Sequence, residues 1–228
     1  MSEKDILIIS PHPDDIEIGM GGTVAKLINQ GFNVTSLVVT DGRRSTTLSG
    51  LSEDKIAKIR EKEAEKAANI LGIKNLFLLG LHDVKRYEKQ EEFKIKLEEI
   101  FDRFHPLEIF TTHPKIDKHP THRTVSNLLL ETLSKRATDN LSIPQKIWCY
   151  EVWTPFEQYG RVEDISDYID MKTASIEAHK SQVEYKNYTE GIKGLNRYRA
   201  VFQDTSGLTD VKYAEVFIEL RETVKSGG

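Results

Sequence analysis

Five short apolar runs, separated by segments with helical periodicity, are the feature that most constrains the fold of this chain. The runs cover residues 6–9, 34–39, 76–79, 107–111 and 147–152. Short continuous apolar runs bounded by turn residues are typical of strands buried on both faces of a sheet. Between them, apolar residues recur at helical spacing over residues 24–31, 56–71, 93–104 and 125–133. This alternation predicts an α/β, Rossmann-like parallel sheet flanked by helices, with right-handed crossovers.

The part of the chain beyond residue 152 has a less regular pattern. Residues 165–185 have the spacing of a helix, and residues 211–220 are expected to form either an edge strand or a helix. A length of 228 residues fits one domain of this kind, and the sequence contains no internal repeat or low-complexity tract. We therefore predict a single domain over residues 1–228 with a C-terminal extension.

Composition excludes several classes of protein. The chain has 32 Lys and Arg against 36 Asp and Glu, which gives a net charge of −4 and no basic stripe for nucleic acid. One cysteine is too few for a disulfide framework or a thiolate zinc module. No apolar run approaches the ~18 residues of a membrane span, and residues 1–5 are too charged for a signal peptide. These features predict a cytoplasmic protein that binds no nucleic acid and does not span a membrane.

Residues with chemical function gather directly after the predicted strands. The segments are residues 11–17 after the first strand, 41–44 after the second, 82–83 after the third and 113–122 after the fourth. In an open parallel sheet, ligands bind beyond the carboxyl ends of the strands. The four segments are therefore expected to meet at one crevice, whose titratable residues include His12, Asp14, Asp15, Asp117, His119 and His122.

Histidine and carboxylate side chains in this crevice indicate a metal site. Zinc binds imidazole nitrogen and carboxylate oxygen, and a catalytic site uses three protein ligands with one position open. His12, Asp15 and either His119 or His122 supply such a set. Asp14 is then placed to act as a general base. Each motif alone is more often a solvated turn or a helix cap, and only their joint position favours a functional site.

A glycine-rich segment offers a competing interpretation. Gly19-Met20-Gly21 resembles the start of a dinucleotide-binding fingerprint, and Asp41 follows about 20 residues later. However, the sixth position of the pattern is Val24 rather than glycine or alanine, and residues 11–18 separate the glycines from the strand. The fingerprint should follow its strand directly. We expect instead that the glycines allow the first helix to start close to the crevice.

Residues 11–23, with the sequence PHPDDIEIGMGGT, resemble the first motif of the LmbE-like, PIG-L family of zinc-dependent N-deacetylases. Further segments are similar to later motifs of that family in the same order, namely residues 60–83, 119–122 (HPTH), 178–182 (AHKSQ) and 213–217 (YAEVF). The resemblance extends over nearly the whole chain. It implies a Rossmann-like fold, one zinc ion per chain, a homo-oligomer, and removal of the N-acetyl group from an N-acetylglucosamine-type sugar conjugate.

The resemblance also implies roles for individual residues. The implied metal ligands are His12, Asp15 and His122. Asp14 would be the general base, and His119, as a protonated imidazole, would stabilise the oxyanion. The residues implied to line the substrate pocket or to support the site are Arg60, Asp83 and His179. From its spacing, Asp117 is expected to orient or charge-balance His119.

Two departures from the family pattern concern the substrate more than the chemistry. Thr121 stands where the family often has Asp, and threonine can also cap a helix. Arg43 stands where an acidic residue is common, and Arg44 follows it. We hypothesise that Arg43 or Arg44 binds an anionic group of the substrate, because guanidinium binds phosphate or carboxylate bidentately. A pair of solvated loop arginines would be the simpler interpretation.

The metal, the proton donor and the reaction each have a second interpretation at the level of sequence. Iron(II) would accept the same ligands as zinc, and either Asp14 or His119 could protonate the leaving amine. The chain could also hydrolyse another small amide, or be a non-catalytic metal- or sugar-binding protein on the same fold. The intact Asp14 favours the enzyme.

Overall fold

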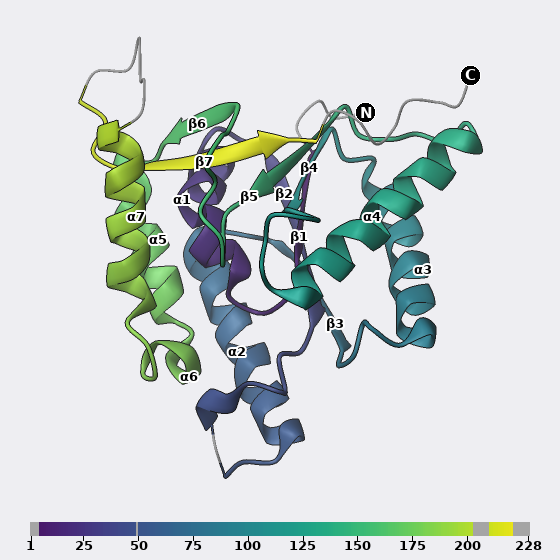
Figure 1. The fold of residues 1–228 in the computed structure, drawn as a ribbon, viewed down its shortest axis with the longest axis horizontal. Helices are drawn as coiled ribbons and strands as arrows, with labels where there is room; N and C mark the ends of the chain where they lie inside the picture. The colour runs from purple at the N-terminus through teal and green to yellow at the C-terminus, as the bar shows by residue number, and fades with distance from the viewer. Residues whose placement is uncertain (1–4, 49, 203–209, 221–228) are drawn as a thin grey trace.

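Seven strands form one mixed sheet in the computed structural model, which describes residues 5–48, 50–202 and 210–220 (Figure 1). Their order across the sheet is β3-β2-β1-β4-β5-β7-β6. The strands are β1 (Asp5–Ser10), β2 (Asn33–Thr40), β3 (Asn75–Leu81), β4 (Glu108–Thr112), β5 (Lys146–Tyr150), β6 (Arg161–Asp164) and β7 (Ala214–Glu219). The five apolar runs of the sequence are therefore β1 to β5, and the α/β prediction is confirmed.

Strands β1 to β5 are parallel, and the strand order reverses at β1. This strand pairs with β2 on one side and with β4 on the other. Ser10 lies opposite Val38, and Ile8 lies opposite Phe110. Such a reversal is a topological switch point, outside which ligands bind at the carboxyl ends of the strands. The ends of β1 and β4 therefore meet where the sequence predicts the site.

Helices cover both faces of the sheet (Figure 1). The long helices are α1 (Asp15–Asn29), α2 (Glu53–Leu71), α3 (Tyr87–Phe104), α4 (Pro120–Thr138), α5 (Ile169–Glu177) and α7 (Tyr188–Phe202); shorter ones are η1 (Thr46–Leu48), η2 (Ser166–Tyr168) and α6 (Lys180–Val183). Leu7 and Ile9 of β1 belong to the core shared with α3 and α4. Ile6 and Ile8 belong to the core shared with α1 and α2. Successive residues of a strand point to opposite faces, so β1 is buried from both sides.

The first helix differs from the prediction, because it begins before the glycines rather than after them. α1 starts at Asp15, and its backbone is non-helical at Met20 (φ −148°, ψ 20°), so it consists of two halves. The chain packs closely here, since a Cβ on Gly19 would lie 2.3 Å from a ring carbon of Tyr150. The absence of a side chain at Gly19 thus allows α1 to pack against Tyr150, whereas the sequence analysis expects the glycines to let the helix start near the crevice.

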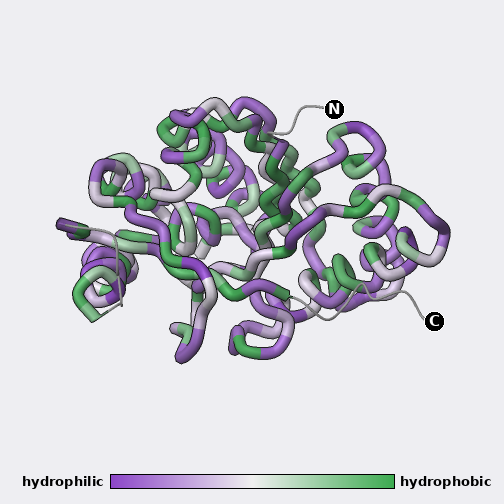
Figure 2. The backbone as a smooth tube through the Cα atoms, turned by 90° about the horizontal axis from the view of Figure 1, so that it is seen from above, coloured by the Kyte–Doolittle hydropathy of each residue, from purple (hydrophilic) through white to green (hydrophobic). Residues whose placement is uncertain are grey.

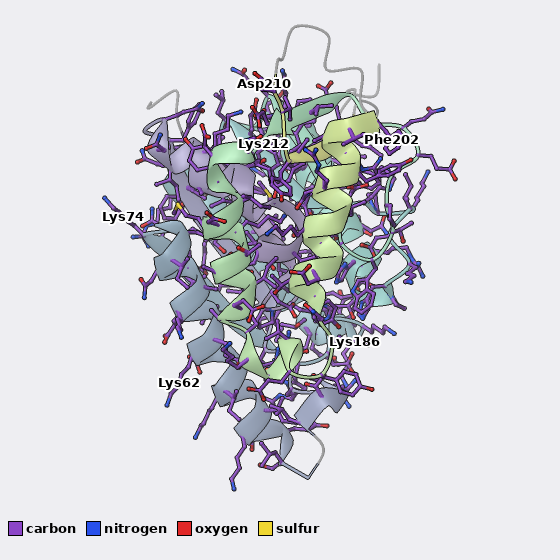
Figure 3. The ribbon with its side chains drawn as sticks, turned by 90° about the vertical axis from the view of Figure 1, so that its left-hand side faces the viewer. Lys62, Lys74, Lys186, Phe202, Asp210 and Lys212 are labelled. Atoms are coloured by element: carbon purple, nitrogen blue, oxygen red, sulfur yellow. The ribbon has the colours of Figure 1, made fainter. Side chains whose placement is uncertain are left out.

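The C-terminal part of the chain departs further from the sequence prediction. Residues 211–220 contain β7, which is not an edge strand but lies between β5 and β6, antiparallel to both. The helix predicted over residues 165–185 is interrupted and forms η2, α5 and α6. The sequence analysis missed β6 and α7. β6 has only four residues and is stabilised by pairing with β7, a contact that local periodicity does not contain. α7 has 15 residues but includes two glycines, which have low helix propensity. Figure 3 shows α2, α5 and α7 side by side at this end of the molecule.

Hydropathy follows this layered arrangement. Figure 2 shows hydrophobic segments concentrated in the interior, with hydrophilic segments mostly around the outside. In the described part of the chain, every helix is too short or too polar to cross a membrane. Residues 1–4, on which the interpretation of the N-terminus depends, lie outside the described residues.

Candidate metal centre and active site

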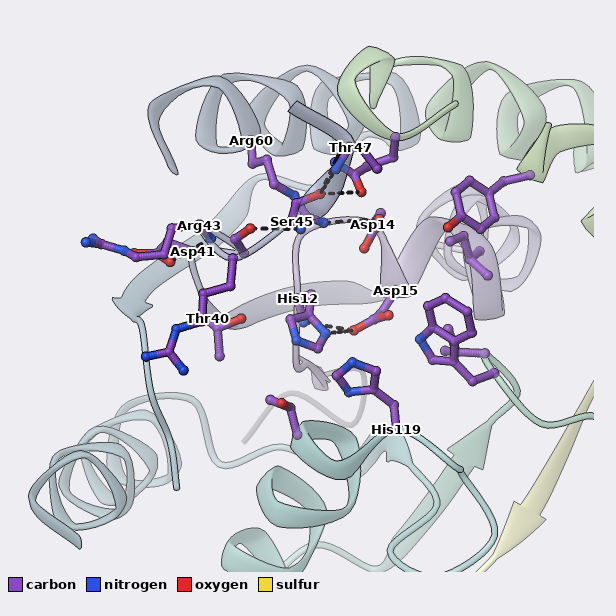
Figure 4. Close-up of a pocket in the computed structure, with 18 of the residues that line it drawn as sticks. His12, Asp14, Asp15, Thr40, Asp41, Arg43, Ser45, Thr47, Arg60 and His119 are labelled. Atoms are coloured by element: carbon purple, nitrogen blue, oxygen red, sulfur yellow. Dashed lines mark hydrogen bonds and ion pairs between the residues drawn. The ribbon is translucent and has the colours of Figure 1, made fainter. Parts of the chain in front are cut away.

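Residues from two distant segments meet where β1 and β4 end. His12, Asp14 and Asp15 follow β1, and His122 lies in the first turn of α4, which follows β4. Figure 4 shows His12, Asp15 and His119 close together in one pocket. The pairing of β1 with β4 carries both segments to the same edge of the sheet, where the sequence analysis expects them.

Three donor atoms of this group form a nearly equilateral triangle. His12 Nδ1 lies 3.0 Å from His122 Nε2. Asp15 Oδ2 lies 3.3 Å from His12 Nδ1 and 3.2 Å from His122 Nε2. A tetrahedral zinc ion with bonds of about 2.0 Å holds its ligands about 3.3 Å apart. The donor set therefore fits one divalent ion with a fourth position open.

His119 offers a different third ligand. The ligand atoms of His12, His119 and His122 lie within 4.8 Å of one another. This set is wider than the triangle that contains Asp15. The shorter distances favour Asp15 as the third ligand, with His119 beside the metal position.

Opposite charges at the metal position hold each other in the charged state. Burial alone would raise the pKa of Asp15, but His122 and His12 together hold it below its ordinary range. Burial likewise lowers the pKa of His122, but Asp15 and Asp117 outweigh this effect and raise it to about 10. A buried imidazole between two carboxylates is a position where a divalent cation can replace the proton.

Asp117 holds both histidines of the second segment. One carboxylate oxygen lies 3.1 Å from His122 Nδ1, and the other accepts a hydrogen bond from the backbone N–H of His119 at 2.7 Å. The carboxylate thus contacts the ring of His122 and only the backbone of His119, whereas the sequence analysis expects it to orient the His119 side chain. A carboxylate on the far nitrogen of a ligating histidine fixes its tautomer and direction.

His119 lies at the pocket wall, in surroundings that favour a neutral imidazole. Burial, together with the neighbouring His12 and His122, lowers the pKa of His119 to about 4. The lowered pKa favours the neutral form of His119, whereas the family resemblance implies a protonated imidazole. Trp153 stacks on the ring, with the ring centroids 6.0 Å apart and an interplanar angle of 23°. A neutral imidazole still donates one N–H, so His119 can still donate a hydrogen bond to an oxyanion.

Asp14 has a strained backbone and a firmly held side chain. Its φ of 119° lies in the region that favours glycine. Arg60 donates to the carbonyl oxygen of Pro13 at 2.5 Å, and the same nitrogen lies 3.1 Å from Asp14 Oδ2. Burial raises the pKa of Asp14 above its usual value although Arg60 opposes the shift. A carboxylate with a raised pKa in a pocket is the kind of group that serves as a general base.

A cavity of about 420 Å³ opens from these groups toward the surface. We define its inner part as the buried and half-buried lining residues around the donor triangle, namely His12, Asp14, Asp15, Arg60 and His119, and its outer part as Arg44 and Asp83 of the loops after β2 and β3. Trp153, Gln182 and Tyr188 also line the cavity. A cavity of this size accommodates a small ligand such as one or two sugar rings.

The two loop arginines have different environments. Arg43 Nε donates to Asp41 at 2.8 Å and Nη1 donates to Asp54 at 3.0 Å, so two carboxylates occupy its guanidinium. In Figure 4 it extends away from His12 and Asp15. The Arg44 side chain is 62% exposed and lies 3.4 Å from Asp83, which is itself in the cavity wall. Arg44 is therefore better placed than Arg43 to contact an anionic ligand.

His179 lies beneath the cavity rather than in its wall. It is 1% exposed, and its Nε2 lies 3.5 Å from Glu17 Oε2. Burial lowers its pKa, but Glu17 and Asp14 outweigh this and raise it. The position favours support of α1 over contact with a substrate.

Sequence reasoning missed the role of Gln182 and its neighbours. Gln182 lines the cavity, and its side chain bonds with Ser45 and Thr47 of the loop after β2. The buried Glu63 accepts hydrogen bonds from the backbone and hydroxyl of Ser181. The AHKSQ motif therefore connects α2, α6 and the cavity. Its polar residues are visible in the sequence, but the sequence does not show which distant residues they bond to.

Comparison with known proteins identifies the family of this chain. The family model described as PIG-L, GlcNAc-PI de-N-acetylase, matches residues 7–133. The diacetylchitobiose deacetylase of Thermococcus kodakarensis is 30% identical over 192 residues, covering 78% of this chain and 70% of that protein. A probable N-acetyl-α-D-glucosaminyl L-malate deacetylase 2 of Bacillus cereus is 28% identical over 187 residues, covering 80% and 85% of the two chains.

Among solved structures, this chain is similar to a deacetylase and also to a protein with a different activity. The N,N'-diacetylchitobiose deacetylase of Pyrococcus horikoshii aligns with a TM-score of 0.79 at 27% identity, covering 95% of this chain and 84% of that one. GalB, a 4-carboxy-2-hydroxymuconate hydratase, aligns with a TM-score of 0.81 at 20% identity, covering 99% of each chain. The second likeness shows only the fold, since one fold can host different chemistries. The sequence matches and the family model together show that this chain belongs to the PIG-L family of LmbE-like proteins.

Proposed function

We propose that this protein is a metal-dependent deacetylase that removes the N-acetyl group from an N-acetylglucosamine-type sugar or sugar conjugate. The observation that carries the proposal is the triangle of His12, Asp15 and His122, with Asp14 beside it on the wall of a sugar-sized cavity. The Bacillus cereus and Thermococcus kodakarensis relatives are named as deacetylases of N-acetylated sugars. Acetate and a free amine would be the products.

We assign His12, Asp15 and His122 as the ligands of one divalent ion, with Asp117 behind His122. Zinc suits two imidazoles and one carboxylate, and iron(II) accepts the same set. When bound there, the ion would lower the pKa of a coordinated water to about 7 and polarise the substrate carbonyl.

Asp14 is assigned as the general base. Its carboxylate lines the cavity, and Arg60 fixes its direction by a contact of 3.1 Å. In hydrolysis, Asp14 accepts the proton of the attacking water while the water oxygen bonds to the acetyl carbon. When the bond between carbon and nitrogen breaks, the amine must gain a proton, and Asp14 now carries one. This proton balance favours Asp14 over the neutral His119 as the donor to the leaving amine.

His119 is assigned to the oxyanion. Its ring lies beside the metal position and is held between Trp153 and the other two histidines. Its Nδ1 is buried without a hydrogen-bond partner among the described residues. A preorganised N–H that acquires a charged partner only in the transition state lowers the barrier selectively.

The related proteins act on different sugar conjugates, so the attached group is not fixed by family membership. The name of one relative contains malate, which is anionic, and that of another contains diacetylchitobiose, which is neutral. Arg44 at the cavity wall favours a conjugate with an anionic group. The single domain, the homo-oligomer and the cytoplasmic location stay predictions.

The test is acetate release combined with metal analysis. Purified protein, stripped of metal and reloaded with Zn²⁺ or Fe²⁺, is given N-acetylglucosamine conjugates with neutral and anionic attached groups. We expect acetate and free amine in equal amounts, only from metal-loaded protein. Metal-loaded protein that binds these sugars without releasing acetate would instead support a non-catalytic binding protein.

A further inference from the structure

A lysine and a glutamate form an ion pair in the interior, away from the cavity wall. Lys172 belongs to α5 and Glu215 to β7, and both side chains are 0% exposed. Lys172 Nζ lies 2.5 Å from Glu215 Oε1. Burying two charges is costly unless each also has further hydrogen-bond partners. The partners of this pair therefore indicate what the pair does.

Among the described residues, the further hydrogen-bond partners of the two charged groups lie in α1, on the two sides of its break at Met20. Lys172 Nζ donates to the carbonyl oxygen of Ile18 at 2.8 Å. Glu215 accepts hydrogen bonds from the backbone N–H groups of Gly22 at 3.1 Å and Thr23 at 2.7 Å. A helix break leaves carbonyls on one side and N–H groups on the other without their usual partners. The ion pair bonds to groups on both sides at once.

The glycines of α1 allow this arrangement. A Cβ on Gly21 would lie 3.2 Å from the Cγ of Lys172, and one on Gly22 would lie 2.7 Å from Ile165. Larger residues would push α1 away from α5 and from the ion pair. The glycine segment thus brings the helix break against the pair, a role unrelated to phosphate binding.

The first half of α1 connects the ion pair to the active site. The backbone N–H of Ile18 donates to the carbonyl oxygen of Asp14 at 3.0 Å, and the carbonyl of Ile18 accepts from Lys172. Asp15 is the first residue of this half-helix. Asp14 keeps its φ of 119° only if the surrounding structure holds it. One short helical segment therefore joins the buried pair to both the metal ligand and the base.

We propose that Lys172 and Glu215 are positioning residues that fix the break in α1 and thereby aim Asp15 at the metal and Asp14 at the substrate. The proposal rests on the proposed metal site. It assigns a role to the C-terminal extension, which contributes no metal ligand but supplies both members of the pair. A pair with a purely structural role would affect the stability of the protein without altering the geometry of the metal ligands.

The test uses Co²⁺ in place of Zn²⁺, because the visible absorption of Co²⁺ reports the geometry of its ligands. The variants are Lys172→Met and the charge-neutral double variant Lys172→Met/Glu215→Gln, each checked for folding by circular dichroism. We expect a changed Co²⁺ spectrum, metal binding about 10- to 100-fold weaker, and a lower kcat at saturating metal with little change in KM.

Two control variants distinguish an effect on the position of the metal ligands from an effect on the stability of the protein. Lys26→Met breaks the contact of 2.7 Å with Glu163, which joins the second half of α1 to β6 beyond the break. Arg136→Met removes a buried arginine that holds Glu98 and Asp102 of α3, far along α4 from the metal. Both controls should keep the wild-type spectrum even where thermal stability falls.

The outcomes distinguish this proposal from the proposed function. Folded Lys172 variants with the wild-type Co²⁺ spectrum and affinity would overturn the positioning role, whatever their stability. Wild-type protein that binds Co²⁺ but releases no acetate would overturn the deacetylase assignment and leave the spectral test intact. Wild-type protein that binds neither Co²⁺ nor Zn²⁺ would overturn both proposals.

Discussion

The inner and outer parts of the cavity are built in opposite ways. At the inner end, His122 is 0% exposed, and its nitrogen lies within 3.2 Å of two other donor atoms. At the outer end, the Arg44 side chain is 62% exposed and makes one long contact with Asp83. Buried donors of matched spacing fix the geometry of a bound divalent ion, whereas exposed loop charges adapt to different partners. We therefore propose that the inner part supports the reaction and that the outer part sets the choice of substrate.

This division predicts that a substitution lowers activity less when the residue lies farther from the metal triangle. Inner residues should affect metal content and kcat, and outer residues should affect KM for particular substrates. A large kcat effect at the rim, or a substrate-specific effect at the metal ligands, would contradict the division.

The largest effect is expected for His122→Ala. This substitution removes one donor of the triangle and leaves Asp15 and Asp117 without their shared imidazole. We expect loss of bound metal and a fall in kcat of roughly 10³-fold or more, because metal-assisted activation of water is lost. Metal content per chain, measured beside acetate release, checks the result. Full metal content with high activity would exclude His122 as a ligand.

Asp14→Asn should retain the metal and lose turnover. The amide keeps the size of the side chain but cannot accept a proton, so we expect kcat to fall about 10²- to 10⁴-fold. Measuring metal content and kcat on the same preparation separates this variant from His122→Ala. Near wild-type turnover of the metal-loaded variant would reject the base assignment.

The inner part was predictable from sequence, for a physical reason. A parallel sheet brings the carboxyl ends of its strands to one edge, so His12 and Asp15 were expected to meet either His119 or His122 if β1 and β4 were neighbours. The resemblance to the family singled out His122. Donor types then indicated the class of metal. Strand positions followed from the same kind of local pattern, whereas the start of α1 at Asp15, before the glycines, did not.

The remaining features depend on contacts between distant segments. No local pattern shows that Lys172 reaches Ile18, that β7 inserts between β5 and β6, or that burial keeps His119 neutral. Spacing also placed Asp117 beside His119, because it could not show that the carboxylate turns toward the ring of His122. Predicting these features requires knowing how distant segments pack against one another.

His119→Ala should have an intermediate effect. Loss of one oxyanion contact typically lowers kcat about 10²- to 10³-fold, and the metal should remain because the triangle is intact. Since the pKa of His119 is lowered to about 4, its contribution should be constant from pH 5 upward. Comparing kcat of wild type and variant at several pH values checks this, and a contribution that disappears between pH 6 and 8 would indicate a protonated imidazole.

Arg60→Met should shift the pH profile more than the maximal rate. The base must be deprotonated, so activity falls as the pH drops through the pKa of Asp14, which burial has raised. Arg60 opposes that shift, and its removal should raise the pKa further and move the acid limb of kcat/KM to higher pH. Arg60→Lys retains the charge and serves as the control. An acid limb that does not move in Arg60→Met would show that another group limits the rate at low pH.

Arg44→Ala should have the smallest effect, confined to KM for conjugates with an anionic group. An exposed ion pair contributes about 0.2–1 kcal/mol, so KM should rise at most about fivefold, with kcat unchanged. Arg43→Ala is the matched comparison, because Asp41 and Asp54 already occupy that guanidinium. If Arg44→Ala raises KM equally for neutral and anionic conjugates, Arg44 only maintains the loop through Asp83. If Arg43→Ala has the larger anion-specific effect, the loop rearranges on binding and frees Arg43 from its carboxylates.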